Sequence, residues 1–364
     1  MMGAMRRQFH DREEATARSR RVLVVTSDVP FVEGGHRVIA RSLAQELQRA
    51  GHESEVLTTP QNRFGRQFSA YLATWLTDVG ESGDGRPVDN VISLRFPSYA
   101  VRHPRHASWL NHRMREYYDL WPRLSASLSR KGRAKEFVRR TLIRRLDTFL
   151  LRRNVTKVYV QSRTIAERLQ RWGGIPSEIL YPPPPDRPYR NEAPEDFVFT
   201  VSRLQSLKRV DLLLHAVAEM RSRTLRAVIA GSGPEEQSLR KLAAELGIAQ
   251  RIDFLGSVDE ATLVDRYARC RGVFFAPLRE DYGFVTAEAF RSGKPVLTAA
   301  DSGGPAELVV DGTSGFVTEA APAAFAKALD RWSEDADLAQ RMGRAGRETA
   351  AGITWPRVIE KLLI

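Results

Sequence analysis

Residues 197–230 read FVFTVSRLQSLKRVDLLLHAVAEMRSRTLRAVIA, and this stretch decides the fold. It opens on the apolar run 197–201, continues with apolar residues at helical spacing from Leu212 to Met220, and closes on a second apolar run, 227–230. Short apolar runs that alternate with helical segments are typical of a parallel sheet buried between helices. The stretch therefore predicts a strand, a helix and a second strand of an α/β fold.

The same alternation extends over both halves of the chain. In the first half, a loop containing Gly34 and Gly35 follows an apolar run at 22–26, and the expected helix ends at Gly51. We expect a right-handed crossover between the strands on either side of this helix. Each half therefore predicts a doubly wound parallel sheet. Further strands are expected at 55–58, 91–96, 158–160, 252–255, 272–276 and 295–298.

The length of 364 residues suits two domains of ordinary size. The run Pro182–Pro185 favours a stiff, extended path, so we place the domain boundary there. The predicted division is a disordered tail over 1–20, an N-terminal domain over 21–185, a C-terminal domain over 186–345, and a last segment, 346–364, whose helix returns to the N-terminal domain.

The composition, 42% hydrophobic and 27% charged, is typical of a globular protein with a sizeable core. The single cysteine, Cys270, is interpreted as a buried thiol in a reducing cytosol. The first twenty residues lack the apolar region of a signal peptide, and no run of about 18 apolar residues suggests a spanning helix. We therefore expect a cytoplasmic protein, and its formal charge of +12 indicates an anionic partner.

Residues 130–153 are strongly basic, with ten Arg or Lys side chains against only Glu136 and Asp147. Apolar residues recur through the segment every three or four positions, at Val138, Leu142, Leu146 and Phe149. Two interpretations fit a basic amphipathic helix: a packed helix with a solvated basic face, or a helix that docks on an anionic membrane, here the inner face of the plasma membrane. Binding of nucleic acid is a third hypothesis, but no helix-turn-helix, zinc or RNA-recognition signature supports it.

Ligands of parallel α/β sheets bind beyond the carboxyl ends of the strands. Arg203 and Lys208 follow the strand at 197–201, where two cations can converge on one diphosphate. Gly231 follows the strand at 227–230 and permits close approach of a ligand to the backbone. Ordinary surface cations and a plain tight turn explain these residues as well.

The most informative stretch is 277–288, PLREDYGFVTAE. Glu280 lies in the loop after a strand, and Glu288 lies about one turn inside the helix that follows. We expect an anion site at the start of this helix, formed by the amides of Gly283, Phe284 and Val285. A carboxylate, a diphosphate site and a second carboxylate in this order suit a sugar–diphosphate–ribose ligand. The two glutamates also fit the simpler role of favourable charges near a helix N-terminus.

The order and spacing of these elements resemble the retaining glycosyltransferases of family 4, which have the GT-B fold. Glu280 and Glu288 match the two glutamates of the family motif, separated by seven residues. The cations after the first strand of the C-terminal half and the Gly-containing loop after the first strand of the chain match as well. The resemblance covers nearly all of residues 22–355.

This resemblance implies two Rossmann-like domains that face each other across a cleft. It implies that Arg203 and Lys208 neutralise the donor diphosphate, that Glu288 binds the ribose hydroxyls, and that Glu280 contacts the transferred sugar. The loop from Gly256 to Val258 would lie near the base of the donor nucleotide.

The resemblance also implies a histidine of the N-terminal domain near the transferred sugar. Our candidate is His112, for which His103 and His106 are competitors. Three features depart from the family pattern: Ser202 and Arg209 stand where glycine is common, and the proline run replaces an Asn-Gly turn.

The activity implied is transfer of a hexose, with retention, from a UDP-sugar or GDP-sugar to a glycan or lipid-linked acceptor in envelope or polysaccharide biosynthesis. No cofactor and no metal ion are expected. Asp335 and Asp337 have the spacing of the metal-binding pair of another glycosyltransferase fold, but their Ala-rich surroundings indicate a solvated helix face. A sugar-nucleotide epimerase or a phosphorylase on the same fold remains an alternative.

Overall fold

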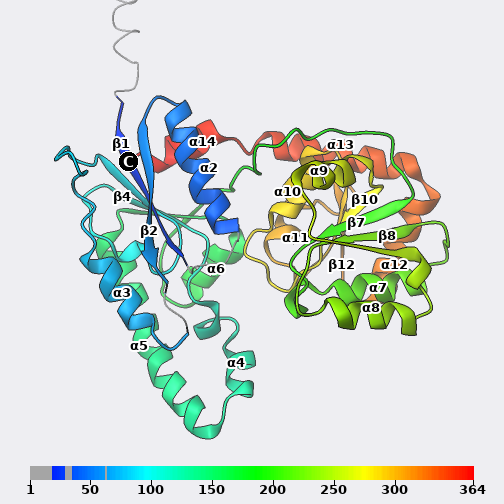
Figure 1. The fold of residues 1–364 in the computed structure, drawn as a ribbon, viewed down its shortest axis with the longest axis horizontal. Coiled ribbons are helices and arrows are strands. Elements are labelled where there is room, and N and C mark those ends of the chain that lie inside the picture. Colours follow the sequence, from blue (N-terminus) through cyan, green and yellow to red (C-terminus); the bar gives the residue numbers. More distant parts are fainter. Residues whose placement is uncertain (1–18, 29–34, 62–63) are drawn as a thin grey trace, which may run out of the picture. The chain divides into compact units, whose positions relative to one another are not determined.

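The computed structural model describes residues 19–28, 35–61 and 64–364 (Figure 1). Most of the predicted tail over 1–20, and Gly34, lie outside these residues. Contacts group the chain into two compact units. Unit 1 comprises the residues up to Tyr159, Trp172–Ser177 and Trp355–Ile364, and unit 2 comprises Val160–Arg171 and Glu178–Thr354. The domain ranges given above stay a prediction, because contacts and sequence composition divide a chain on different grounds.

The first sheet is parallel where its register is defined, and its strand order is β2-β1-β3-β4-β5-β6. The central strands β1, β3 and β4 are mostly buried, and β1 reads as an apolar run because both of its faces are covered. The strands are β1 (Arg21–Asp28), β2 (Glu53–Pro60), β3 (Asn90–Ser93), β4 (His106–Leu110), β5 (Lys157–Val160) and β6 (Glu178–Ile179).

The helices of unit 1 cover both faces of this sheet (Figure 1). The last helix packs against α2 and β4, and Trp355 meets Trp109 edge to face at 6.1 Å. Of two short 3-10 turns, Ser98–Ala100 lies between β3 and β4, and Arg115–Tyr117 lies between β4 and α4. The helices are α2 (Gly35–Arg49), α3 (Gln67–Leu76), α4 (Trp121–Ser127), α5 (Arg130–Asn154) and α14 (Trp355–Leu362).

The second sheet is also parallel, with the strand order β12-β11-β10-β7-β8-β9. Its order reverses between β7 and β10, which is the topological switch point where ligands of doubly wound sheets bind. Its strands are β7 (Phe197–Val201), β8 (Arg226–Ala230), β9 (Ile252–Gly256), β10 (Gly272–Phe274), β11 (Val296–Ala299) and β12 (Gly315–Thr318).

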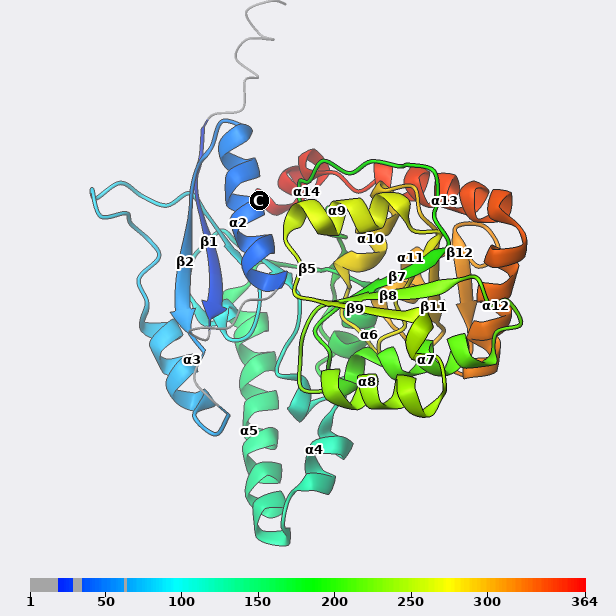
Figure 2. The same cartoon turned by 45° about the vertical axis from the view of Figure 1, so that its right-hand side comes forward.

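In unit 2, helices α7, α8 and α12 lie on one face of the sheet, and α9, α10 and α13 lie on the other (Figure 2). The two apolar cores divide along the same faces, one around Leu213, Phe325 and Trp332, and the other around Tyr267, Phe275 and Phe290. The helices are α6 (Arg163–Arg171), α7 (Val210–Glu219), α8 (Glu236–Glu245), α9 (Glu260–Arg269), α10 (Phe284–Arg291), α11 (Gly304–Leu308), α12 (Pro322–Glu334) and α13 (Ala336–Ala351).

Two parallel doubly wound sheets confirm the predicted fold class. Cys270 is buried, as interpreted from its apolar flanks. Strand β4 and the short strands β6 and β12 were not predicted. None of the helices described here is long and apolar enough to cross a membrane.

Helix α5 carries the basic segment, and its buried face differs from the apolar stripe read from the sequence. Val138, Leu142 and Phe149 are exposed, by 59%, 48% and 55%. The buried face contains Ile143, Leu150 and Leu151 together with both acidic residues of the segment. Three of the four apolar positions read from the sequence are therefore exposed, while Leu146 is half-buried. A second set of apolar residues packs the helix onto the rest of unit 1.

The buried carboxylate of Asp147 explains how α5 is fixed. It accepts hydrogen bonds from the hydroxyls of Tyr71, Tyr99 and Tyr118, the last at 2.6 Å. Burial raises the pKa of Asp147, and the nearby Arg113 and the tyrosine hydroxyls act in the opposite direction. A buried carboxylate is tolerated when donors saturate it, so this cluster ties α3 and the two 3-10 turns to α5.

Candidate functional site

The loops that follow β7 and β8 pack directly on each other at the carboxyl edge of the second sheet. Gly231 has a φ of +113°, and a Cβ atom there would lie 1.9 Å from the carbonyl oxygen of Ser202. A Cβ atom at Gly233 would lie 2.3 Å from the carbonyl oxygen of Leu204. The Leu204 amide donates to the Ser232 carbonyl oxygen at 2.9 Å. Glycine is therefore required here by the neighbouring loop, whether or not a ligand also approaches.

The loops that follow β10 and β11 form a second close pair. The Glu280 amide donates to the Ser302 carbonyl oxygen at 2.7 Å, and the Gly304 amide donates to the Glu280 carbonyl oxygen at 3.0 Å. A Cβ atom at Gly303 would lie 2.5 Å from that same carbonyl oxygen. The backbone of Glu280 is thus held on both sides, which fixes the origin of its side chain.

Lys208 and Glu280 meet at this edge. The Lys208 Nζ lies 2.8 Å from the Glu280 Oε2, and both side chains are largely buried, with 16% and 24% exposed. Lys208 comes from the loop after β7, and Glu280 comes from the loop after β10, on the two sides of the switch point. The structure therefore brings together one predicted cation and one predicted carboxylate.

The other predicted cation, Arg203, lies on the same loop as Lys208 but is exposed. No hydrogen bond or ion pair of its guanidinium is present among the residues that the structure describes. The N–H donors of the Arg203 guanidinium therefore stay available to bind an anion.

Arg209 explains one departure from the family pattern. Its backbone is left-handed, with a φ of 51°, a conformation that glycine adopts without strain. Its guanidinium binds both carboxylate oxygens of Asp301, at 2.6 and 2.9 Å, and donates to the carbonyl oxygens of Ala276 and Pro277. These bonds offset the strain and link the start of α7 to the ends of β10 and β11.

Helix α10 begins as predicted, with Gly283 at its N-cap. Gly283 has a φ of +78°, and a Cβ atom there would lie 2.5 Å from the Phe275 ring. Phe284 and Val285 form the first turn of the helix, where backbone amides have no intrahelical acceptor. The helix start therefore offers amide donors at the same sheet edge as Lys208.

Glu288 is buried, with 6% exposed, and protein donors occupy its carboxylate. The Tyr267 hydroxyl donates to Oε2 at 2.8 Å, and Arg187 forms an ion pair with Oε1. Burial and the adjacent Glu288 charge raise the pKa of Tyr267, so its hydroxyl stays protonated. Arg187 also lies 3.2 Å from Glu260. Sequence reasoning missed both partners, since Arg187 lies 101 positions before Glu288 and only the fold brings them together.

We expect Arg187→Ala to lower the free energy of unfolding by about 2 kcal/mol, because it leaves a buried carboxylate with a single donor. Urea unfolding of the variant measures this loss. Arg190→Ala is the matched control, because Arg190 pairs only with partly exposed acids, Glu192 and Asp265. Equal stability of the two variants would contradict the structural importance of the Arg187 contact.

Three further positions, predicted or neighbouring, have structural roles or surroundings that need no ligand. Val258 follows β9 and packs, partly buried, on the core of unit 2. Glu307, at the end of the paired-glycine turn, accepts from the amides of Arg163 and Thr164, each at 2.7 Å. It therefore caps the start of α6 through a contact that the sequence did not reveal. Asp335 likewise caps α13, where it accepts from the Leu338 amide at 2.8 Å.

The histidines of unit 1 differ in their surroundings. His112 is half-buried after β4, and its Nδ1 lies 2.9 Å from the Arg113 carbonyl oxygen. Both ring nitrogens of His103 lie 3.0 Å from carbonyl oxygens, of Arg105 and Val88. His106 is fully buried in β4, with ring nitrogens 2.8 Å from the Asn154 carbonyl oxygen and the Ser93 hydroxyl. His103 and His106 are thus engaged by the protein itself, and the role of His112 stays a prediction.

A charged cluster that the sequence analysis did not identify lies where α2 begins, beside Gly35. The His36 Nε2 is 3.5 Å from the Asp28 Oδ1, and Arg37 pairs with the same carboxylate. Burial, together with the charge of Arg95, lowers the pKa of His36 to about 4. Gly34, the other glycine predicted for this loop, lies outside the described residues.

His106 predicts how stability depends on pH. Burial lowers its pKa to about 4, whereas an unfolded histidine titrates near 6.5. Below about pH 6.5, His106 binds a proton in the unfolded chain but stays neutral in the folded protein. The free energy of unfolding therefore falls as the pH drops from 6.5 to 4. We expect His106 to contribute about 1 to 3 kcal/mol to this loss. Unfolding of wild type and His106→Gln at several pH values measures it, and an unchanged slope in the variant would contradict the assignment.

Part of the chain matches a protein family and several characterised proteins. Residues 186–349 match the family described as glycosyl transferases group 1. The D-inositol 3-phosphate glycosyltransferase of Nocardia farcinica is 38% identical over 180 residues, which cover 46% of this chain and 40% of that protein. The corresponding protein of Streptomyces avermitilis is 38% identical over 165 residues, 42% of this chain and 35% of its own length. The matched part thus spans well under half of these relatives.

Solved structures match over nearly the whole chain. Sucrose-phosphate synthase from Thermosynechococcus elongatus has a TM-score of 0.73 and 16% identity, covering 94% of this chain and 97% of its own. The Anabaena protein HepE in complex with UDP and glucose has a TM-score of 0.67 and 17% identity, covering 94% and 99%. WaaG, a glycosyltransferase involved in lipopolysaccharide biosynthesis, has a TM-score of 0.70 and 16% identity, covering 94% and 98%. At these identities the likeness shows the fold, which is GT-B.

Proposed function

We propose that this chain is a retaining, metal-independent glycosyltransferase that moves a hexose from a nucleoside-diphosphate sugar to a glycan or lipid-linked acceptor. The observation that carries the proposal is the convergence at one sheet edge of Lys208, Glu280 and the start of α10. A cation, a carboxylate and free helix amides are the groups that a sugar diphosphate needs. The family match over 186–349 covers all three.

The donor would lie along the loops that follow β7, β10 and β9. Lys208 and Arg203 neutralise the diphosphate with the amides of Phe284 and Val285, and Glu280 contacts the transferred sugar. Glu288 binds the ribose hydroxyls. Arg187 now pairs with the Glu288 Oε1, so it must either release this oxygen to the ribose or share it with a ribose hydroxyl. The loop at 256–258 lies near the base. The likeness to the structure bound to UDP and glucose supports a nucleotide-sugar donor, and we propose a UDP-sugar or a GDP-sugar.

The reaction breaks the bond between the sugar C1 and the diphosphate oxygen, and its electron pair leaves with the diphosphate. Positive charge develops on the sugar and negative charge on the leaving group, so cations and amides fixed around the phosphates stabilise the transition state. The acceptor hydroxyl oxygen forms the new bond to C1 from the same face. Its proton passes to a phosphate oxygen of the leaving group, and bond formation on the face that the diphosphate leaves gives retention of configuration.

The proposed binding of a lipid-linked acceptor is based on a surface of unit 1. Helix α5 exposes Val138, Leu142 and Phe149 between basic side chains, a pattern that suits an anionic membrane surface. A lipid-linked acceptor in envelope or polysaccharide biosynthesis, met by a cytoplasmic protein at the inner face of the membrane, would fit this surface. Selective sedimentation with acidic liposomes, lost when several of these charges are reversed, tests it. Equal recovery with neutral liposomes would contradict it.

Two measurements test the transfer itself. A nucleoside diphosphate that binds only the folded protein at 100 times its Kd should stabilise it by about 2.7 kcal/mol, which a thermal-shift screen detects. Incubation of the corresponding sugar nucleotide with candidate acceptors should yield a glycosidic product with the anomeric configuration of the donor. An epimerised nucleotide sugar or a free sugar phosphate in place of a glycoside would favour the epimerase or phosphorylase alternative.

A further inference from the structure

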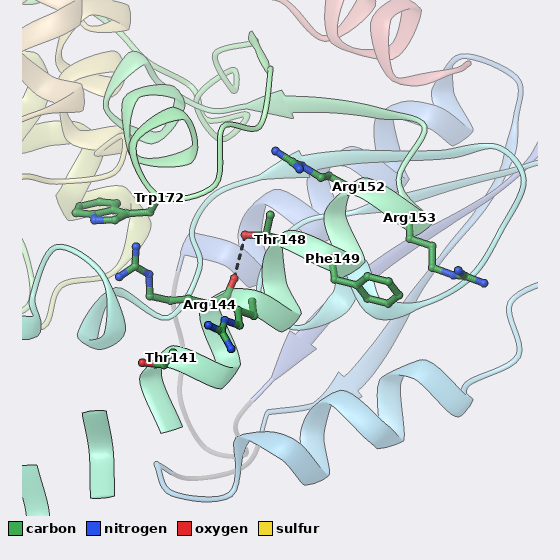
Figure 3. Close-up of a pocket in the computed structure, with 8 residues that line it drawn as sticks. Thr141, Arg144, Thr148, Phe149, Arg152, Arg153 and Trp172 are labelled. Atoms are coloured by element: carbon green, nitrogen blue, oxygen red, sulfur yellow. Dashed lines mark hydrogen bonds between the residues drawn. The ribbon is translucent and has the colours of Figure 1, made fainter. Parts of the chain in front are cut away.

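A hollow of about 690 Å³ lies between one face of α5 and the side chain of Trp172. All of its lining residues belong to unit 1. Figure 3 shows Arg144 beside Trp172, with Phe149 and Arg153 further along the helix. The lining consists of Thr141, Arg144, Arg145, Thr148, Phe149, Arg152, Arg153 and Trp172.

The hollow concentrates positive charge that the protein does not neutralise. Four arginines line it, and no acidic residue does. Within the described chain, none of these four arginines forms an ion pair with a carboxylate, although Arg139 on the same helix pairs with Glu136. Neither acidic residue of α5 lines the hollow: both are buried, and Asp147 is bound by three tyrosine hydroxyls. Like charges so close repel one another, and an anion would relieve this repulsion.

Two of the arginines are already positioned. The Arg152 Nη2 donates to the carbonyl oxygens of Gly173 and Gly174, at 2.9 and 3.4 Å, which joins α5 to the turn after Trp172. The Arg144 guanidinium lies 5.5 Å from the centre of the Tyr118 ring, which itself lies 5.8 Å from the Trp172 ring. The Arg144 Nε is buried and has no hydrogen-bond partner among the described residues. An unused buried donor beside a cationic hollow indicates a missing acceptor.

We propose that this hollow binds the phosphate group of a phosphorylated ligand. Planar guanidinium groups match phosphate oxygens with two donors at a time, and several arginines around one hollow are the usual arrangement for phosphate recognition. Trp172 and Phe149 supply apolar walls for the rest of the ligand. The phosphate can come from a soluble phosphate ester or from a lipid headgroup. The proposal concerns a site in unit 1 and does not rest on the proposed sugar transfer.

Binding of glycerol 3-phosphate to the full-length chain tests the proposal. This probe carries the same phosphate monoester as the headgroup of phosphatidic acid. Isothermal titration should show saturable binding that weakens at least about tenfold in R144Q/R145Q/R153Q, because one lost charge-assisted hydrogen bond already corresponds to about that factor. The matched control R130Q/K131Q/K135Q removes three positive charges from the same helix outside the hollow, and it should bind within about twofold of wild type.

Co-sedimentation with phosphatidylcholine vesicles, with and without phosphatidic acid, distinguishes the two sources of phosphate. Vesicle binding that needs phosphatidic acid and the hollow arginines identifies a headgroup, and binding of the soluble ester alone identifies a small ligand. If the triple variant fails to fold, R145Q/R153Q, which changes two exposed arginines, replaces it. Equal losses in the test and control variants, or the absence of saturable binding to both probes, would overturn the proposal.

Discussion

Replacement of Lys208 by alanine is expected to lower the kcat of sugar transfer by about 10²–10³. A fixed donor aimed at a leaving group contributes about this factor, because it stabilises charge that appears only in the transition state. In the structure the ammonium lies 2.8 Å from Glu280 and is largely buried, so its position is set before any ligand binds. Steady-state rates with saturating donor measure the effect. We expect kcat to fall more than KM rises, since the lost interaction strengthens as the diphosphate leaves.

Lys241→Ala is the matched control for this experiment. Lys241 lies in the same unit but is exposed, 3.5 Å from Glu245 of its own helix, and its loss should leave transfer unchanged. Arg203→Ala should lower kcat on the same grounds as Lys208→Ala. Near-normal transfer by either the Lys208 or the Arg203 variant would refute the assignment of these cations to the diphosphate.

Glu280→Gln separates the carboxylate from the cation that it holds. The neutral amide keeps the shape of the side chain but removes the charge that orients Lys208. A double-mutant cycle with Lys208→Ala measures the coupling between the two residues, which neighbours in one ion pair are expected to show.

The sequence predicted the architecture because central strands of both sheets are buried on both faces. Strands such as β7 and β11 are continuous apolar runs separated by helical segments, and this alternation has few other interpretations. Strand β4 escaped prediction for a physical reason. It reads HASWL, with two polar side chains that are buried because His106 finds its partners on other elements. No local pattern reveals such a strand.

The candidate site was predictable to the extent that it follows strand ends. Lys208, Glu280 and the start of α10 each come directly after a strand of the second sheet, and parallel strands place their carboxyl ends together. The partners of Glu288 were not predictable, because the ion pair with Arg187 and the cap formed by Glu307 join residues more than 100 positions apart. Spacing in the sequence says nothing about such contacts.

Helix α5 carries two sets of apolar residues, and the sequence left open whether its apolar stripe packs on the protein or docks on a membrane. The structure buries a different set of residues, which includes two carboxylates. The tyrosines that saturate Asp147 come from three separate elements, so the packing face is polar at its centre. Of the apolar residues read from the sequence, Val138, Leu142 and Phe149 are exposed, and Phe149 lines the arginine-rich hollow.

Gly231→Ala is expected to lower the free energy of unfolding by about 2–5 kcal/mol. The backbone at this position has a φ of +113°, which costs an alanine about 1–2 kcal/mol. The new Cβ would also lie 1.9 Å from the Ser202 carbonyl oxygen, so the loops after β7 and β8 must move apart at a typical cost of 1–3 kcal/mol. Urea unfolding followed by far-UV circular dichroism measures the sum.

Gly247→Ala isolates the part of this loss that comes from close packing. Gly247 lies in the same unit and also has a positive φ, of +68°, but a Cβ atom there would meet no atom within 4 Å. It should therefore lose only the conformational cost, about 1 kcal/mol. Because the clash in Gly231→Ala pushes on the loop that carries Arg203 and Lys208, that variant should also weaken donor binding, which Gly247→Ala should not. Equal losses of stability in the two variants would show that these two loops do not touch as the structure places them.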